Sequence, residues 1–287
     1  MRFNLILLAS FALGTFAFAQ DNSSSDRMPL AGPGTTATES SPAHSDDATN
    51  LAAPPVMFAQ TKSQAVPAQS SRKEPAMDET IYPKGSTALL LIDPYNDFLA
   101  EDGKMWPALS EVAKSVDLHA NISRTRGAVR EAGMPIFILP HHRHKPADFE
   151  GWTHLTPSQR AAHQYQLFAV DSWGGEWYPG FGPEPGDIVV KEHWGASSFA
   201  NTDLDVQLRQ HGITHVIFIG LIANTCIETS ARHAAELGYH VTLVRDATAA
   251  MSSESMHAAH DINGPAYAHA IVTTAELVQQ LNVGGVQ

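Results

Sequence analysis

The chain has 287 residues, of which 43% are hydrophobic, and it carries a formal net charge of −12 and a single cysteine. This acidic balance argues against nucleic acid and anionic membranes as partners, because neither offers a counter-charge to an acidic surface. One cysteine excludes an intramolecular disulfide, so the core alone must hold the fold. We therefore expect the partner to be a small molecule.

The first residues have the three parts of a secretory signal peptide. Arg2 gives a basic start, residues 5–16 form an apolar core too short to span a bilayer, and Ala17-Phe18-Ala19 is an A-x-A cleavage site. A membrane anchor is the alternative, but no second apolar stretch long enough to cross a bilayer follows. We predict that residues 1–19 are removed and that the mature chain is secreted or periplasmic.

Residues 20–83 differ in composition from the rest of the chain. They are rich in Ser, Thr, Ala, Pro, Gln and Asp and poor in large apolar residues, so they cannot bury enough surface to offset the entropy of ordering. This composition predicts a disordered tether. Residues 84–287 then leave roughly 200 residues, the usual size of one domain with a full core.

The first half of this domain has the pattern of a β-α-β unit. Thr87–Ile92 is a short apolar run, typical of a strand buried on both faces. Spaced apolar residues over 107–131 predict one helix, and Met134–Leu139 is a second apolar run. An irregular insert rich in His, Trp, Gly and Pro follows at 141–187, and we expect it to form the wall or lid of a pocket.

Strands and helices alternate again after the insert. The predicted strands are 187–191, 215–219, 240–245 and 270–273, and the predicted helices are 203–211, 225–237, 254–263 and 274–281. Six apolar strands alternating with helices predict an α/β fold. Its sheet is doubly wound, Rossmann-like, mostly parallel and six-stranded, with helices on both faces.

Three residues with acid, base and nucleophile chemistry fall at predicted strand ends, where such sheets bind ligands. Asp93 follows the first strand, Lys191 ends the third and Cys226 follows the fourth. Cys226 begins a predicted helix, so the helix dipole should favour its thiolate. Each residue also has a structural alternative, as a turn cap, a solvated strand end and a buried apolar side chain respectively.

These positions carry motifs that resemble a known family. Ile92–Phe98 resembles the D-x-Q/N-x-D-F opening of the isochorismatase-like cysteine hydrolases, and Val190-Lys191 resembles their lysine strand. Gly220–Ile227 resembles their G-x-x-x-[DN]-x-C-[VI] elbow. The resemblance covers about residues 86–283 with the motifs in the family's order, and it implies the isochorismatase-like form of the predicted sheet.

The resemblance also implies an Asp-Lys-Cys triad. Cys226 would attack a carbonyl carbon, Asp93 would take the thiol proton and pass it to the leaving amine, and Lys191 would hold both groups in register by its charge. A cis peptide bond is implied at Leu221-Ile222. The backbone N–H groups of Ile222 and Cys226 would then form the oxyanion site.

The presence of the cysteine bears on the reaction. In this family, isochorismatases that hydrolyse a vinyl ether usually lack it, and members that keep it mostly cleave amide or ureido C–N bonds. Cys226 therefore predicts a hydrolase for a small amide or related C–N bond that works through an acyl-enzyme without a cofactor. Two alternatives stay open: a vinyl-ether hydrolase with Asp93 as the acid, and a non-catalytic binding or effector protein on the same scaffold. Relatives often assemble, so we expect a homo-oligomer.

Aromatic and imidazole side chains near the predicted strand ends are candidates for the substrate pocket. They are Phe98, His141, His193, Trp194 and Phe199. Asp97, inside the first motif, is expected to order a loop rather than to act as a second base.

A histidine cluster over residues 141–144 lies where the nicotinamidase branch of the family places a zinc site, built from Asp-x-His and a later His. No Asp stands two residues before any of these histidines, so that pattern is broken. Imidazoles suit zinc, but we expect these side chains to line the pocket or to be solvated, with no bound metal.

Overall fold

The structure is a computed structural model that describes residues 81–283. The predicted signal peptide and residues 20–80 of the predicted tether lie outside the described residues. Tyr82 is 5% exposed and packs in the hydrophobic core, so the folded domain already includes this residue. Within 81–283, no helix is both long enough and apolar enough to cross a membrane.

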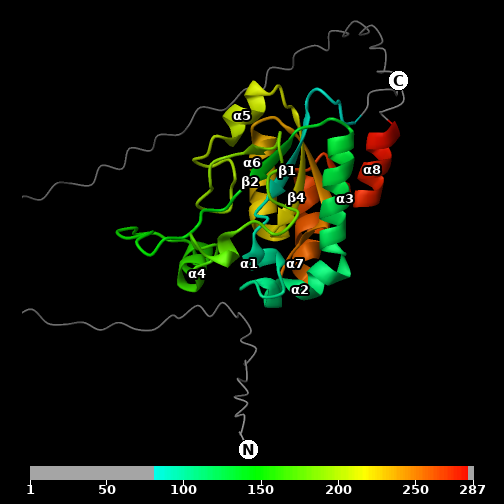
Figure 1. Cartoon of the computed structure of the whole chain (residues 1–287). Coiled ribbons are helices and arrows are strands. Elements are labelled where there is room, and N and C mark those ends of the chain that lie inside the picture. Colours follow the sequence, from blue (N-terminus) through cyan, green and yellow to red (C-terminus); the bar gives the residue numbers. More distant parts are fainter. Residues whose placement is uncertain (1–80, 284–287) are drawn as a thin grey trace, which may run out of the picture. The chain divides into compact units, whose positions relative to one another are not determined.

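Six parallel strands form the central sheet (Figure 1). They are β1 (Thr87–Ile92), β2 (Ile136–Leu139), β3 (Ile188–Val189), β4 (His215–Leu221), β5 (His240–Ala249) and β6 (Ala270–Val272). Their order across the sheet is β3-β2-β1-β4-β5-β6. The predicted doubly wound parallel sheet is therefore confirmed.

Apolar strands bury both faces of this sheet, as their sequences predict. All six residues of β1 are buried, and alternate side chains of β1 point into two separate hydrophobic clusters. One cluster lies under α2 (Trp106–Ser115), α3 (Leu118–Glu131) and α8 (Thr274–Val283), and the other lies under α5 (Leu204–Gln210) and α6 (Glu228–Glu236). Figure 1 shows α3 and α8 on one side of the sheet and α5 and α6 on the other.

Three predicted helices differ from the observed ones. The helix predicted over 107–131 is two helices, because Asp117 has φ of 51° and interrupts the regular backbone between α2 and α3. The helix predicted from residue 225 begins with a π-helical turn, η2 (Ala223–Ile227), ahead of α6. The one predicted over 254–263 is α7 (Ser253–His257) followed by the π-turn η3 (Ala258–Asn263) and the 3₁₀ turn η4 (Gly264–Ala266).

The insert after β2 is more ordered than its sequence predicts. It contains α4 (Pro157–Tyr165), begun by a capping box at Thr156, and the 3₁₀ turn η1 (Trp173–Gly175). It is tied to the short helix α1 (Asn96–Leu99): Asp97 Oδ2 accepts the Phe168 N–H at 2.8 Å, and Asn96 donates to the Trp173 carbonyl at 2.8 Å. The predicted loop-ordering role of Asp97 is confirmed.

The direction in which successive strands are added to the sheet reverses between β1 and β4. From β1 the chain runs outward to β2 and β3, and from β4 it runs the other way to β5 and β6. The carboxyl ends of β1 and β4 therefore flank the topological switch point, where sheets of this kind bind ligands.

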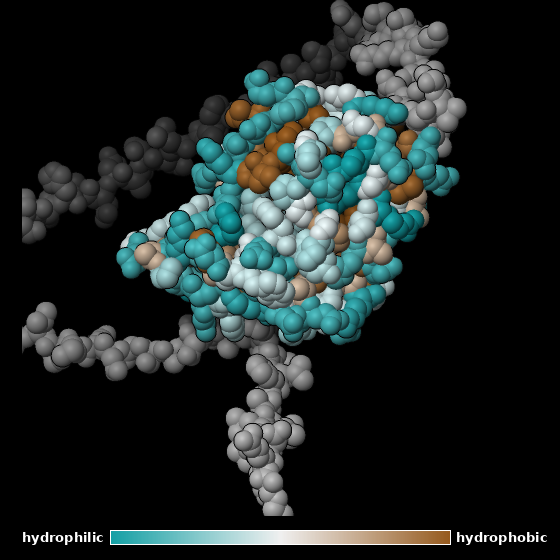
Figure 2. Space-filling view, viewed as in Figure 1, coloured by the Kyte–Doolittle hydropathy of each residue, from teal (hydrophilic) through white to brown (hydrophobic). Residues whose placement is uncertain are grey.

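The surface is mainly hydrophilic on the face seen in Figure 2, with a hydrophobic patch next to α5. Among the large apolar side chains of the described residues, Val189 on edge strand β3 is 45% exposed and Val206 on α5 is 61% exposed. A short edge strand limits pairing with other chains.

We expect His260 to make the domain less stable in acid. Burial, followed by the charge of Arg245, lowers the pKa of His260 to about 4, whereas histidine in an unfolded chain titrates near 6.5. His260 binds a proton less readily in the folded than in the unfolded chain. Its contribution to the free energy of unfolding is therefore fully present above about pH 6.5 and is lost as the pH falls towards about 4. A shift of this size corresponds to about 3 kcal/mol.

Urea unfolding near pH 7 and near pH 4.5 measures this loss. Between these two pH values, the free energy of unfolding of His260→Gln should fall by about 2–3 kcal/mol less than that of the natural chain. Equal losses in the two proteins would contradict the assignment.

Candidate active site

Four neighbouring strands deliver polar side chains to one edge of the sheet. Asp93 follows β1, His141 follows β2, His193 follows β3, and Cys226 lies in η2 after β4. Because β3, β2, β1 and β4 are parallel neighbours, their carboxyl ends share this edge. A further parallel bridge pairs His141 with His193 beyond the end of β3.

Asp93 and His193 form a fully buried pair. The side chain of each is 0% exposed, and His193 Nε2 donates to Asp93 Oδ1 at 3.0 Å. The other ring nitrogen, Nδ1, donates to the Gly195 carbonyl at 2.6 Å. Burial acts to lower the pKa of His193, but the charge and hydrogen bond of Asp93 outweigh it and raise this pKa. With both ring nitrogens facing oxygen acceptors, the geometry favours an imidazolium cation.

Lys191, the predicted third member of the triad, is not part of this cluster. It is exposed, and its backbone N–H donates to Asp203 Oδ1 at 2.8 Å. Within residues 81–283, no hydrogen bond or ion pair joins its side chain to Asp93 or Cys226. The reason is local: β3 ends at Val189, and the chain rejoins the edge only at His193. His193, which sequence reasoning placed only in the pocket, supplies the cation expected from Lys191.

Cys226 is 8% exposed and sits beside Asp93. Burial raises the pKa of its thiol well above the ordinary value, and the charge and hydrogen bond of Asp93 raise it further, against smaller opposing effects of Thr225 and the Ile222 backbone. The expectation that the helix terminus favours the thiolate was therefore wrong, because burial and a neighbouring anion outweigh the dipole.

The carboxylate of Asp93 is arranged to receive the thiol proton. Its Oδ1 is taken by His193, while its Oδ2 is buried without a conventional hydrogen-bond partner in the described part of the chain. The Cys226 thiol interacts with Asp93, and this interaction is among the causes that raise the pKa of the thiol.

The turn between β4 and η2 brings the cysteine close to β1. Gly220 has φ of +111°, and a Cβ atom there would lie 2.2 Å from the Ile92 carbonyl oxygen, so only glycine fits. The peptide bond between Leu221 and Ile222 is cis, as the family resemblance implied. The Ile222 backbone opposes the rise in the pKa of the thiol, so this predicted oxyanion donor lies close to the nucleophile. The matching role of the Cys226 N–H stays a prediction.

His141 is a pocket candidate that lies beside the buried pair. Its ring is edge-on to that of His193, with centroids 5.0 Å apart, and its Nδ1 donates to the His142 carbonyl at 3.0 Å. Burial and then the neighbouring His193 lower the pKa of His141 to about 4, although the Asp93 charge opposes them. His141 is therefore a neutral imidazole near pH 7.

The remaining pocket candidates are mainly packing residues. Phe98 is 5% exposed and meets Phe168 edge to face at 4.7 Å, on the face of the sheet opposite to Cys226. Phe199 is 6% exposed and belongs to the same hydrophobic cluster as Cys226. Trp194 stacks on His142 at 3.5 Å.

One group of side chains in residues 81–283 has the donor set of a divalent metal site. Ligand atoms of His142, His144 and Asp148 lie within 4.8 Å of one another, and both ring nitrogens of the buried His144 lack a partner among the described residues. His142, however, already faces two carboxylates, with Nε2 2.7 Å from Asp148 and Nδ1 3.2 Å from Glu192. Nitrogen and oxygen ligands of this kind suit zinc, but each ring nitrogen of His142 already faces a carboxylate, so His142 would have to give up one of these hydrogen bonds to bind it.

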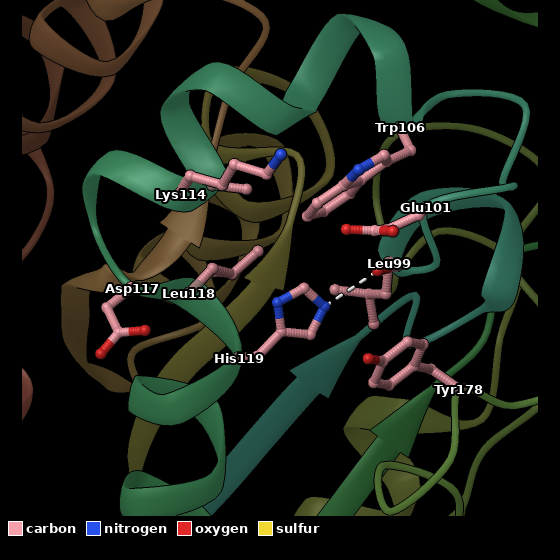
Figure 3. Close-up of a pocket in the computed structure, with 9 residues that line it drawn as sticks. Leu99, Glu101, Trp106, Lys114, Asp117, Leu118, His119 and Tyr178 are labelled. Atoms are coloured by element: carbon pink, nitrogen blue, oxygen red, sulfur yellow. Dashed lines mark hydrogen bonds between the residues drawn. The ribbon is translucent and has the colours of Figure 1, made fainter.

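A cavity of about 380 Å³ lies elsewhere, and Figure 3 shows the side chains that line it. His119 projects into its centre and hydrogen bonds to the Leu99 carbonyl at 2.9 Å, with Trp106 and Tyr178 on either side. None of the four side chains at the strand ends lines it. The cavity is therefore separate from the Asp93 cluster.

A buried carboxylate, a buried imidazole and a thiol meet at the switch point of a doubly wound sheet, and these are the groups that an α/β hydrolase with covalent cysteine chemistry requires. The family comparison agrees. Residues 87–276 match the Isochorismatase domain family, and the chain belongs to this family.

The chain is similar in sequence to two ureidoacrylate amidohydrolases. It is 33% identical to ureidoacrylate amidohydrolase RutB of Rhizobium rhizogenes over 186 residues, which cover 61% of this chain and 75% of that protein. It is 29% identical to ureidoacrylate amidohydrolase RutB of Variovorax paradoxus over 253 residues, covering 84% of this chain and 89% of the relative.

Solved structures share the fold. A cysteine hydrolase from Pseudomonas syringae pv. phaseolicola superposes with a TM-score of 0.61 at 22% identity, over 70% of this chain and 95% of the other. An Isochorismatase family protein from Burkholderia thailandensis gives a TM-score of 0.55 at 24% identity, over 70% and 98% of the two chains. At this identity the likeness concerns the fold alone.

Substitutions at the two candidate cations should separate their roles. We expect His193→Gln to lower kcat/KM by about 100-fold, because the cation beside Asp93 is lost. His193→Lys restores a positive charge and should retain more activity than the glutamine variant. Lys191→Ala should stay within about twofold of the natural chain, as exposed substitutions usually do.

Steady-state kinetics on any hydrolysed amide, with a thermal melt for each variant, make this comparison. A large loss in Lys191→Ala with a small one in His193→Gln would restore the lysine to the triad.

Proposed function

We propose that the protein hydrolyses a small amide or ureido C–N bond through a covalent intermediate on Cys226, with Asp93 as the proton carrier and His193 as the cation that positions it. The protein is an amidohydrolase of the isochorismatase family that acts on C–N bonds other than peptide bonds. The observation that carries the mechanism is the buried Asp93, which bonds to His193 through Oδ1, has no other partner for Oδ2 among the described residues, and lies beside the Cys226 thiol.

The first half of the reaction forms the acyl-enzyme. As Cys226 Sγ attacks the carbonyl carbon, the thiol proton passes to Asp93, so sulfur becomes a thiolate only as it reacts. The carbonyl oxygen becomes negatively charged, and the N–H groups of Ile222 and Cys226 stabilise it. When this intermediate collapses, Asp93 returns the same proton to the leaving nitrogen, which departs as an amine or ammonia.

The second half regenerates the enzyme. Asp93, again a carboxylate, accepts a proton from water as the oxygen attacks the thioester carbon, and then protonates the departing sulfur. His193 keeps its proton throughout. Its bond to Asp93 fixes the carboxylate, and its bond to the Gly195 carbonyl fixes the ring.

The vinyl-ether alternative is less well supported. It needs no nucleophile, yet Cys226 lies against the carboxylate that would serve as the acid. A binding protein on this scaffold would gain little stability from a fully buried ion pair, because desolvation of the two charges offsets most of their attraction.

The relatives support a ureido or similar small substrate. Two of those described above carry the name ureidoacrylate amidohydrolase. A planar carbonyl between nitrogen substituents fits the same attack geometry as an amide, and specificity among such substrates would lie in the insert after β2.

Export of the protein is also part of the proposal. Its support is the basic start, apolar core and A-x-A site of residues 1–19. Site-specific sequencing of the mature N-terminus after expression tests it, since cleavage after Ala19 is the expected result. Assembly as a homo-oligomer stays a prediction that sedimentation would test.

Loss of the nucleophile should abolish activity. We expect Cys226→Ala to reduce kcat/KM by at least about 1,000-fold for amides, because no acyl-enzyme can form. A panel of small amides, ureides and nicotinamide, assayed by ammonia release, finds the substrate. Intact mass after rapid acid quench should show an acyl adduct on the natural chain and none on the variant. Retention of hydrolysis by Cys226→Ala would favour the ether-type mechanism with Asp93 as the acid.

A chelator should leave this activity unchanged. The proton steps use Asp93, His193 and Cys226, none of which belongs to the His142, His144 and Asp148 group. Dialysis against EDTA, followed by assay and metal analysis of the same sample, checks this. Loss of activity that zinc restores would show that this group holds a metal that catalysis needs.

A further inference from the structure

His141 is fixed in place from several sides. Its backbone carbonyl accepts a hydrogen bond from the Tyr95 hydroxyl at 3.0 Å, and its Nδ1–H donates to the His142 carbonyl at 3.0 Å. Its ring also packs against those of His193 and Phe168, with centroids 5.0 and 5.4 Å away. A side chain held in this way meets a ligand without first losing rotamer freedom.

The fixed tautomer leaves one lone pair free. Because Nδ1 is the donor, Nε2 of His141 is an acceptor. Nε2 forms no hydrogen bond among residues 81–283, and the His141 side chain is only partly buried. His141 therefore presents a neutral acceptor at the mouth of the site.

This acceptor lies near the point where the leaving group must be. Asp93 has to be within hydrogen-bond reach of the leaving nitrogen to protonate it, and the His141 ring lies beside the ring of His193, which bonds to Asp93. The carboxyl ends of β1 and β2 are adjacent, which places the two side chains on neighbouring strands. A leaving nitrogen next to Asp93 can thus direct an N–H towards His141.

We propose that His141 is a specificity-determining residue, whose Nε2 accepts a hydrogen bond from an N–H on the leaving nitrogen of an amide or ureide. The inference rests on the proposed function and extends it to the choice of leaving group. An ester of the same acid lacks this N–H, although it needs the same attack by Cys226 and the same proton from Asp93. His141 therefore favours the C–N bond over the C–O bond at the scissile position.

Two substitutions separate the acceptor from the ring. His141→Phe keeps a flat ring against His193 and Phe168 but has no acceptor, whereas His141→Gln keeps an acceptor oxygen at the end of the side chain. Each is assayed on matched pairs that differ only in the leaving group. The pairs are nicotinamide with methyl nicotinate, and benzamide with methyl benzoate.

The expected result is a change in preference rather than a general loss. His141→Phe should lower kcat/KM for the amide or ureide about 10- to 100-fold, the cost of an unpaired polar group, and leave the ester within about threefold. His141→Gln should recover part of the amide activity. An equal loss on both members of a pair, or an unchanged ratio, would overturn the role of His141.

Failure of the proposed function has a different signature. Cys226→Ala should be inactive on amide and ester alike, and residual turnover in that variant would refute the covalent mechanism whatever His141 does. If the acyl adduct forms on Cys226 but the amide-to-ester ratio is the same in the His141 variants as in the natural chain, the proposed function is supported and the specificity role of His141 is refuted.

Discussion

The hydrogen-bonded pair of Asp93 and His193 is the interaction on which the rest of the site depends. Both side chains are fully buried, and taking two charges out of water costs several kcal/mol for each ion. Part of this cost is offset because both nitrogens of His193 and one oxygen of Asp93 have partners. The other oxygen has no partner among the described residues, and the Cys226 thiol lies beside this carboxylate, which thus connects the ends of β1, β3 and β4.

A histidine in this position constrains the site differently from a lysine. An ammonium group on four methylenes must give up side-chain entropy to hold one geometry, whereas an imidazolium is planar and has two N–H groups in fixed directions. At His193 one of these directions meets the Gly195 carbonyl and the other meets Asp93. The backbone after β3 thereby sets the orientation of a carboxylate on a different strand.

Much of the fold could be predicted from sequence because buried parallel strands are continuous apolar runs. β1, with all six residues buried, was found at its observed bounds. Helix interruptions were not predictable in the same way. Asp117 adopts a left-handed conformation, which an aspartate tolerates, but an aspartate in the sequence does not by itself predict that conformation. The π-turn at Cys226 likewise depends on how η2 packs beneath β4, which is a tertiary effect.

The site was predictable to the level of strand ends and no further. Asp93 and Cys226 stand directly after long buried strands, so topology alone brings them together. β3 has only two residues, and the chain beyond it is irregular until the bridge at His193. A short strand gives no alternation from which to decide whether Lys191 or His193 faces the edge, and the sequence motif chose the wrong one.

The raised pKa of Cys226 fits the division of labour among these groups. A thiol that stays protonated at rest beside a carboxylate keeps a single proton within the pair. That proton moves to Asp93 only when an electrophilic carbon accepts the sulfur, and the leaving nitrogen then carries it away. A site that lowered the thiol pKa would have released the proton to solvent before substrate arrived, and Asp93 would have had none to give the amine. Burial of the nucleophile thus supplies the acid for the second step.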